Sequence, residues 1–131
     1  MRAAYYERQG SAQEVLTVGE LPDPEPGAGE VRVRMRFSGI NPSDIKTRTG
    51  FGGKAMPFPL IVPHQDGAGI IDAVGPGVPE TRVGERVWIY MAQWGRAFGT
   101  AAEFVVVPSL QAVKLSDNVS LASLSRSSIC F

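Results

Sequence analysis

The sequence has little of what disulfide bonds and membrane spans require. Its 131 residues include a single cysteine, Cys130, so an internal disulfide is excluded. No segment approaches 18 consecutive apolar residues, and the N-terminal stretch MRAAYYERQG contains no apolar run. The sequence therefore predicts neither a membrane span nor a secretory signal. We expect a cytoplasmic protein without a membrane partner.

The sequence also lacks an excess of charge of either sign. Thirteen lysines and arginines are balanced by thirteen aspartates and glutamates. Binding to nucleic acids or to anionic membranes normally requires a basic excess, so a polyanionic partner is not expected. The length fits one domain that is large enough to bury a hydrophobic core.

Glycine and proline are abundant, with 15 and 10 residues, and they separate short segments of β-type sequence. The clearest such segment is EVRVRMRFSG, where Val31, Val33, Met35 and Phe37 alternate with three arginines. This period of two predicts a strand with one buried face and one solvated arginine face that pairs with acidic neighbours. Further strands are expected at 2–7, 14–21, 69–75, 85–91, 102–108 and 112–116, and the proline-rich stretch 22–30 is expected to be a loop.

One segment carries the start and stop signals of a short helix. In NPSDIKTRTG, Asn41 is a suitable N-cap, Pro42 fits the first helical position and Gly50 is a suitable stop. The stretch that begins at Ser116 starts like a capped helix but becomes serine-rich. A catalytic thiol at Cys130 is not expected, because chain ends fray and no histidine is near it in sequence.

The glycine cluster in VPHQDGAGIIDAVGPG does not fit a dinucleotide-binding loop. Asp72 stands where the third glycine of the fingerprint belongs, and the β-type sequence IIDAV follows in place of a helix. Gly67 and Gly69 are better explained by a strand that lies very close to a neighbour, with a turn at 75–77.

Four blocks in a fixed order, SGINPSD, PHQDGAGIIDAVGPGV, VGERVW and GTAAEFVVVP, resemble a known family. They are similar to the N-terminal, GroES-like substrate domain of the medium-chain dehydrogenase/reductase superfamily, specifically its zinc-independent quinone oxidoreductase branch. The resemblance covers 1–119 and leaves 120–131 as a truncated or atypical tail. It implies a mainly β fold, a partly open β-barrel with short helices. The separate Rossmann domain that binds NADPH in this family is expected to be absent from this chain.

The resemblance also implies that no zinc is bound. In the zinc-dependent relatives a cysteine and a histidine ligate the catalytic metal, and their places fall here on Asn41 and Gln65. Amides are poor zinc ligands beside thiolate and imidazole. His64 lies one residue early, and in an extended segment such a slip turns a side chain to the opposite face. His64 is then either a solvent-exposed or hydrogen-bonded structural residue, or part of the wall of the cofactor cleft.

By the same resemblance, a small group of side chains faces the cleft in which nicotinamide and substrate meet. These residues are Asn41, Asp44, Phe51, Gln65 and Asp66, and the pocket wall is expected to include His64, Trp94 and Phe98. For Asn41 and Asp44 the alternative is that they only cap the helix. For the three aromatic residues the alternative is ordinary packing in the loops of the barrel.

The function that the resemblance implies is hydride transfer from NADPH to a quinone or an activated double bond, without zinc. The chain alone is expected to be inactive because NADPH is bound mainly by the missing domain. The expected partner is a small-molecule quinone or enone, and self-association into a homo-oligomer is compatible with an uncovered cleft face. Two alternatives stay open: a non-catalytic, cochaperonin-like binding module and a decayed reductase fragment.

Overall fold

A computed structural model of the protein describes residues 1–121 and 123. Within these residues a five-stranded sheet has the strand order β6-β3-β4-β5-β7, and β1 and β2 form a separate pair. All the strand pairs are antiparallel. The strands are β1 (Arg2–Tyr5), β2 (Thr17–Glu20), β3 (Glu30–Gly39), β4 (Asp66–Val74), β5 (Arg86–Ile89), β6 (Phe104–Pro108) and β7 (Ala112–Lys114). The α-helices are α1 (Ala12–Val15) and α2 (Pro42–Thr49), and the 3₁₀ turns are η1 (Phe51–Gly53), η2 (Glu80–Arg82) and η3 (Ser109–Gln111).

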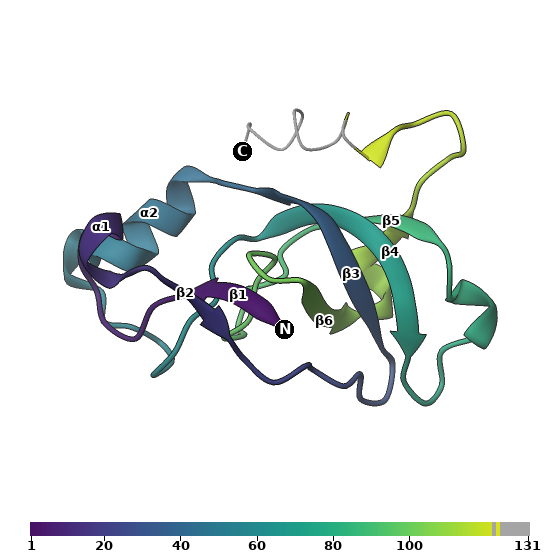
Figure 1. The fold of residues 1–131 in the computed structure, drawn as a ribbon, viewed down its shortest axis with the longest axis horizontal. Coiled ribbons are helices and arrows are strands. Elements are labelled where there is room, and N and C mark those ends of the chain that lie inside the picture. The colour runs from purple at the N-terminus through teal and green to yellow at the C-terminus, as the bar shows by residue number, and fades with distance from the viewer. Residues whose placement is uncertain (122, 124–131) are drawn as a thin grey trace.

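The long strands β3 and β4 lie side by side and curve across the molecule (Figure 1). Two bulges interrupt their pairing, one between Arg32 and Val33 and one between Met35 and Phe37. Bulges increase local twist and bend a strand, so they help the sheet to curl into a half-barrel. The predicted mainly β, GroES-like, partly open barrel with short helices is confirmed.

The main core fills the inside of this curled sheet. Its fully buried side chains come from alternating positions of four strands, such as Val31 and Val33 of β3 and Val105 and Val107 of β6. A smaller core lies around Tyr6, Val15 and Ile61, where the N-terminal segment covers the barrel end. Each buried aliphatic side chain contributes about 1.5–3 kcal/mol of transfer free energy, so the sheet is the principal source of stability.

Glycine in β4 is required by the close approach of β3. A Cβ on Gly69 would lie 2.2 Å from the carbonyl oxygen of Arg34, and a Cβ on Gly67 would lie 2.6 Å from that of Phe37. No side chain fits at either distance. The glycines therefore serve strand packing, as the sequence predicts, and no helix N-terminus for a pyrophosphate follows them.

Two local predictions differ from the structure. The strand expected at 14–21 is divided into α1 and β2, because Glu14 accepts a hydrogen bond from the backbone N–H of Ser11 and so closes a helical turn. Phe37 was expected on the buried face but is 37% exposed. The bulge after Met35 inserts one extra residue, which shifts the alternation of side chains from that point.

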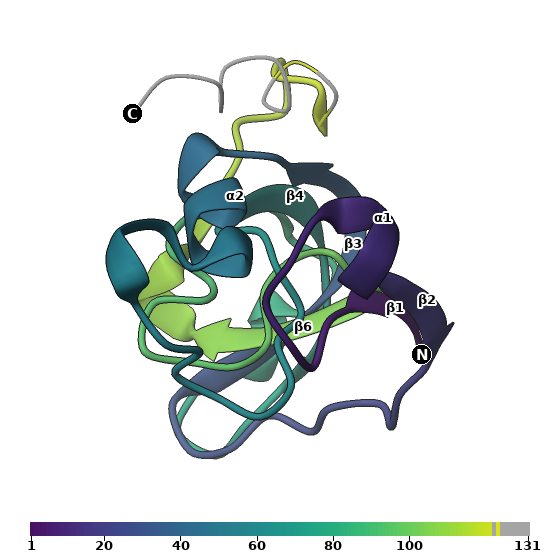
Figure 2. The same cartoon turned by 90° about the vertical axis from the view of Figure 1, so that its left-hand side faces the viewer.

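The helix predicted at 41–50 is confirmed as α2. Asn41 is its N-cap in an extended conformation, and Gly50 ends it in the left-handed conformation with φ 69°. Figure 2 shows α1 and α2 together at one end of the barrel. In the part of the chain that the structure describes, no helix is both long and apolar enough to cross a bilayer. Cys130 and most of the predicted tail, residues 122 and 124–131, lie outside the described residues.

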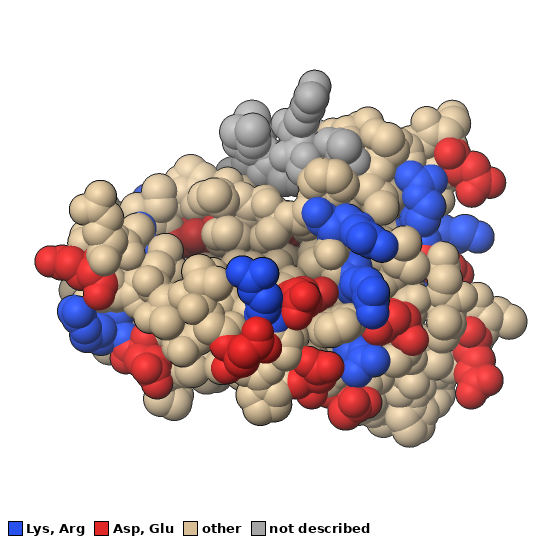
Figure 3. Space-filling view, in the orientation of Figure 1, with Lys and Arg blue, Asp and Glu red and all other residues tan. Residues whose placement is uncertain are grey.

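On the arginine face of β3, Arg32 is paired with acidic neighbours. Arg32 donates to both carboxylate oxygens of Asp72 on β4, at 2.9 and 3.3 Å, and it also pairs with Glu25 at 3.2 Å. Its guanidinium lies over the ring of Phe104, 5.1 Å from the centroid. Positive and negative side chains are accordingly interleaved over this face in Figure 3. This surface has the mixed charge predicted from the sequence.

Candidate functional site

Polar side chains gather where β3 ends, α2 begins and β4 begins. They come from three segments that are distant in the sequence, 38–44, 64–66 and Thr100, and hydrogen bonds or charge interactions connect them. We call this group the polar cluster, and its members are Ser38, Asn41, Asp44, His64, Asp66 and Thr100. Four of the eight residues predicted for the site or its wall are therefore brought together.

The amide of Asn41 is fixed by a carboxylate. Its Nδ2 donates to Oδ2 of Asp66 at 2.6 Å, and its backbone N–H donates to Oδ2 of Asp44 at 2.7 Å. Asn41 is only 9% exposed and Asp44 only 7%. Asp44 therefore has the capping role that the sequence left open for it. Asn41 occupies the N-cap position and, in addition, has an amide oriented by a charge-assisted hydrogen bond.

The carboxyl of Asp44 is perturbed by its surroundings. Burial raises the pKa of Asp44 above the ordinary value, and the negative charge of Asp66 raises it further. Hydrogen bonds from the backbone of Asn41 and of His64, together with the charge of His64, act in the opposite direction on this pKa. The same carboxylate thus connects the start of α2 to the segment that carries the histidine.

His64 has a left-handed backbone, with φ 81°, so the extended segment assumed from the sequence does not exist at this residue. Its ring faces the cluster, and Nδ1 lies 2.7 Å from Oγ of Ser38. Burial lowers the pKa of His64, and the negative charge of Asp44 opposes that shift. The imidazole is therefore neutral at pH 7. The ring is therefore hydrogen-bonded, and its place in the wall of the cofactor cleft stays a prediction.

Two hydroxyl residues of the cluster were missed from the sequence. Oγ of Ser38 lies 2.8 Å from Oγ1 of Thr100, which in turn donates to the backbone carbonyl of Asp66 at 2.7 Å. Thr100 is 1% exposed. The two residues are 62 positions apart, so no local pattern pairs them. The only signal is that they belong to the blocks SGINPSD and GTAAEFVVVP, which carried the resemblance.

Gln65 does not contribute its side chain to the cluster contacts. Its Oε1 accepts a hydrogen bond from the backbone N–H of Gln93 at 3.0 Å, and its carbonyl accepts from Ala92 at 2.8 Å. Gln65 therefore anchors the loop that follows β5. The adjacent residue Asp66 carries the polar group that reaches Asn41.

The predicted aromatic residues are exposed on loops. Trp94 is 71% exposed, Phe51 is 67% exposed and Phe98 is 46% exposed. Phe51 lies under the ammonium group of Lys46, 5.6 Å from its ring centroid. None of the three lies in the hydrophobic core. Loop packing and a place in the pocket wall both stay open for them. Exposed aromatic side chains of this size are surfaces that another molecule or another part of a protein can cover.

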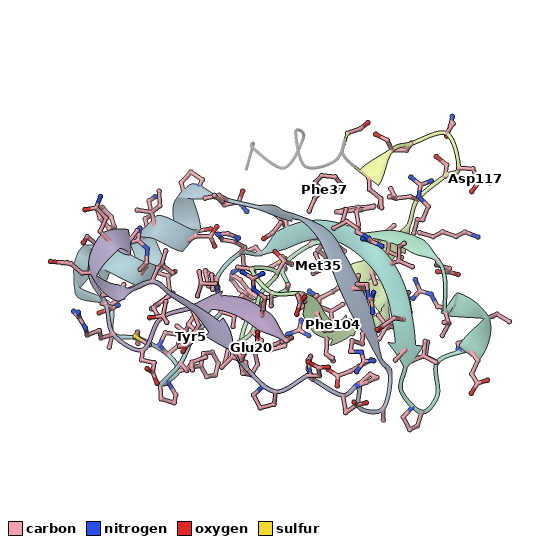
Figure 4. All side chains as sticks on the ribbon, viewed as in Figure 1. Tyr5, Glu20, Met35, Phe37, Phe104 and Asp117 are labelled. Carbon is pink, nitrogen blue, oxygen red and sulfur yellow. The ribbon has the colours of Figure 1, made fainter. Side chains whose placement is uncertain are left out.

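An open groove of about 370 Å³ adjoins the cluster from the side of β1. Its walls include Ala4, Met35 and Ala102, and it reaches both Ser38 and Thr100. Figure 4 labels Met35 and Phe37, which line it from the distal half of β3. The hydroxyl pair of the cluster therefore borders a hollow at the surface.

With this fold and cluster established, comparisons with known proteins define the class. Residues 27–117 match the family described as the alcohol dehydrogenase GroES-like domain. The human synaptic vesicle membrane protein VAT-1 homolog is 36% identical over 88 residues, which are 67% of this chain and 21% of that protein. The chloroplastic quinone-oxidoreductase QR1 of Triphysaria versicolor is 32% identical over 127 residues, which are 95% of this chain and 38% of that protein.

A solved structure has the same fold. The mycobacterial protein Rv1454c, in complex with NADPH, has a TM-score of 0.77 and 29% identity, and the match covers 92% of this chain and 35% of that one. The chain belongs to the GroES-like domain family of the medium-chain dehydrogenase/reductase superfamily, whose members here include quinone oxidoreductases and alcohol dehydrogenases. It spans between a fifth and two fifths of the length of these relatives.

Proposed function

We propose that this chain forms the substrate side of a zinc-free, NADPH-dependent reductase that acts on a quinone or an activated double bond. The observation that carries the proposal is the amide of Asn41, which is nearly buried and held by Asp66 at 2.6 Å at the start of α2. The relatives of the chain include a quinone oxidoreductase and a protein solved with NADPH. These relatives support a quinone as the acceptor and NADPH as the cofactor.

We propose a reductase without zinc because of the side-chain amides of Asn41 and Gln65. Asn41 and Gln65 stand in the places of the metal ligands of zinc-dependent relatives, and each is engaged in a hydrogen bond within the protein. Amide groups are weak ligands for zinc. Among the described residues, no three histidine, cysteine, aspartate or glutamate side chains are placed to hold a metal ion together. The donor set therefore does not fit a catalytic zinc.

The residues that the structure describes fit one end of NADPH, the nicotinamide end. Gly67 and Gly69 lie inside a strand where β3 leaves no room for a phosphate, so the described residues offer no pyrophosphate loop at this cluster. The polar cluster is suited to the nicotinamide end, because Asn41 can offer its second amide N–H to a polar group of the nicotinamide or of the substrate. NADPH, when bound, supplies the hydride.

The contribution of this chain is then orientation and exclusion of water. An amide that is fixed by Asp66 loses no side-chain freedom when it binds, and correct placement of donor and acceptor accounts for a large part of the barrier reduction in such reactions. Trp94, Phe98 and Phe51 offer flat apolar surfaces on which a quinone ring can pack. On its own the chain holds half of a cleft, and we propose that it is inactive in that form.

Ligand titration followed by NMR tests this assignment in the chain itself. We would add reduced nicotinamide mononucleotide and, separately, tetramethyl-benzoquinone, whose filled ring positions resist addition by a thiol. We expect both ligands to bind weakly and to change the NMR chemical shifts of Asn41, His64 and Trp94. This binding should be lost in Asn41→Ala and retained in Asn118→Ala. Shift changes confined to the groove beside β1, around Val18 and Ala102, would contradict the proposed site.

A further inference from the structure

The hydroxyl chain of the polar cluster determines where its hydrogens must be. Oγ1 of Thr100 lies 2.7 Å from the carbonyl oxygen of Asp66, and a carbonyl oxygen can only accept. Thr100 has one hydroxyl hydrogen, so that hydrogen points to Asp66. In its contact of 2.8 Å with Ser38, Thr100 must therefore be the acceptor.

Counting hydroxyl hydrogens in the same way determines the donor in the contact between Ser38 and His64. Ser38 also has one hydroxyl hydrogen, and it is used in the bond to Thr100. In its contact of 2.7 Å with the ring of His64, Oγ of Ser38 must then accept, so the hydrogen belongs to Nδ1 of His64. Burial lowers the pKa of His64, so the ring carries only this one hydrogen at neutral pH.

We propose that Ser38 and Thr100 are positioning residues that hold neutral His64 as its Nδ1–H tautomer and so leave Nε2 as a hydrogen-bond acceptor in the candidate site. The group that this acceptor suits is an N–H or O–H donor of a ligand, or a proton. The tautomer is a property of the resting chain and holds whichever acceptor the site reduces.

Three features fix the direction in which the hydroxyl and ring hydrogens of Thr100, Ser38 and His64 point. Thr100 is 1% exposed, so water does not compete for its hydrogen. The carbonyl of Asp66 belongs to the first residue of β4, so its position is set by the sheet. The left-handed backbone of His64 is held by its hydrogen bond to Asp44. The chain of bonds therefore starts from a fixed acceptor and ends at the ring.

NMR of the 15N-labelled full chain measures the tautomer directly. The sequence has a single histidine, so the only imidazole nitrogens belong to His64. At about pH 7.5, above the ordinary histidine pKa of about 6.5, long-range 1H–15N correlation distinguishes a protonated ring nitrogen from an unprotonated one. We expect a protonated Nδ1 and an unprotonated Nε2. A wild-type spectrum with the hydrogen on Nε2 would overturn the proposal.

Substitutions at Thr100 test the cause. Thr100→Val keeps the shape but frees the hydrogen of Ser38, which can then point to Nδ1, so the dominant tautomer should change to Nε2–H. Thr100→Ser should keep the wild-type tautomer, and Thr17→Val, on the exposed surface of β2, is the matched control. An unchanged tautomer in Thr100→Val refutes the role of the hydroxyl chain.

A second variant covers the case in which Thr100→Val does not fold. Ser38 is exposed, and Ser38→Ala removes the acceptor of the Nδ1–H without opening the core. The Nδ1–H population should fall in this variant, and Ser38→Thr should restore it. If Ser38→Ala has the same tautomer population as the wild type, the proposal is wrong.

Discussion

Removing the hydrogen bond between Asn41 and Asp66 is the perturbation that tests the site most closely. Nδ2 of Asn41 lies 2.6 Å from Oδ2 of Asp66, and Asn41 is 9% exposed. A hydrogen bond to a charged group contributes about 1.5–3 kcal/mol. Because Asp66 keeps some contact with water, we expect Asn41→Ala to lower the free energy of unfolding by about 2 kcal/mol, near the lower part of this range.

Urea unfolding followed by tryptophan fluorescence measures this change. With a slope of about 2 kcal/mol per M, a loss of about 2 kcal/mol lowers the midpoint by roughly 1 M. A double-mutant cycle with Asp66→Ala should give a coupling free energy of about 1–2 kcal/mol. Asn118→Ala is the control, because Asn118 contacts Ser116 on the exposed surface, and it should change stability by less than about 0.5 kcal/mol.

Two results would refute the predicted coupling between Asn41 and Asp66. If Asn41→Ala leaves the midpoint unchanged, or if the two single losses simply add in the double variant, the amide is not held by Asp66. The role that we propose for Asn41 in orienting a ligand would then have no structural basis.

Three further predictions concern the strand contact, the histidine and the metal. Gly69→Ala should lower the free energy of unfolding by more than about 3 kcal/mol or prevent folding, because its Cβ would lie 2.2 Å from a backbone oxygen. Gly27→Ala should be tolerated, because its Cβ would meet only the side chain of Glu30. Circular dichroism of the two variants checks this difference. The pKa of His64 is lowered on folding, so its contribution to stability is present above its unfolded pKa of about 6.5 and is lost as pH falls through the folded pKa. Unfolding midpoints at pH 5 and pH 7.5 should therefore differ less in His64→Asn than in the wild type, and an equal difference would contradict the assignment. Elemental analysis should find no stoichiometric zinc, and chelation should leave the unfolding midpoint unchanged; about one tightly held zinc per chain would refute the amide argument.

Local signals in the sequence predicted the elements that depend on neighbouring residues. Asn41, Pro42 and Gly50 marked both ends of α2, and the crowded glycines of β4 indicated a close strand contact. These features need only the backbone preferences of a few residues. The short helix α1 was missed although Ser11 and Glu14 have the spacing of a capping box, because the apolar residues around it also fit a strand.

The hydrogen-bonded contacts of the site depend on register and on distant segments, and a single sequence contains neither. The bulge after Met35 exposes Phe37, and nothing in the alternating pattern marks it. The bond between Ser38 and Thr100 joins two segments that only the folded sheet brings together. The resemblance placed Gln65 and Asp66 at the cleft as a pair, but only the side chain of Asp66 reaches the cluster, because that of Gln65 holds the loop after β5.

The central claim is that this chain supplies the substrate side of a zinc-free NADPH-dependent reductase. The most direct test joins the chain to the dinucleotide-binding part of a quinone oxidoreductase relative and measures quinone-dependent NADPH oxidation in the presence of a chelator. We predict turnover by the joined protein, strong loss of turnover in its Asn41→Ala variant, and no turnover by the 131-residue chain alone. A joined protein that binds NADPH, as measured by its fluorescence, but does not reduce the quinone would contradict the account, and so would turnover that the chelator abolishes.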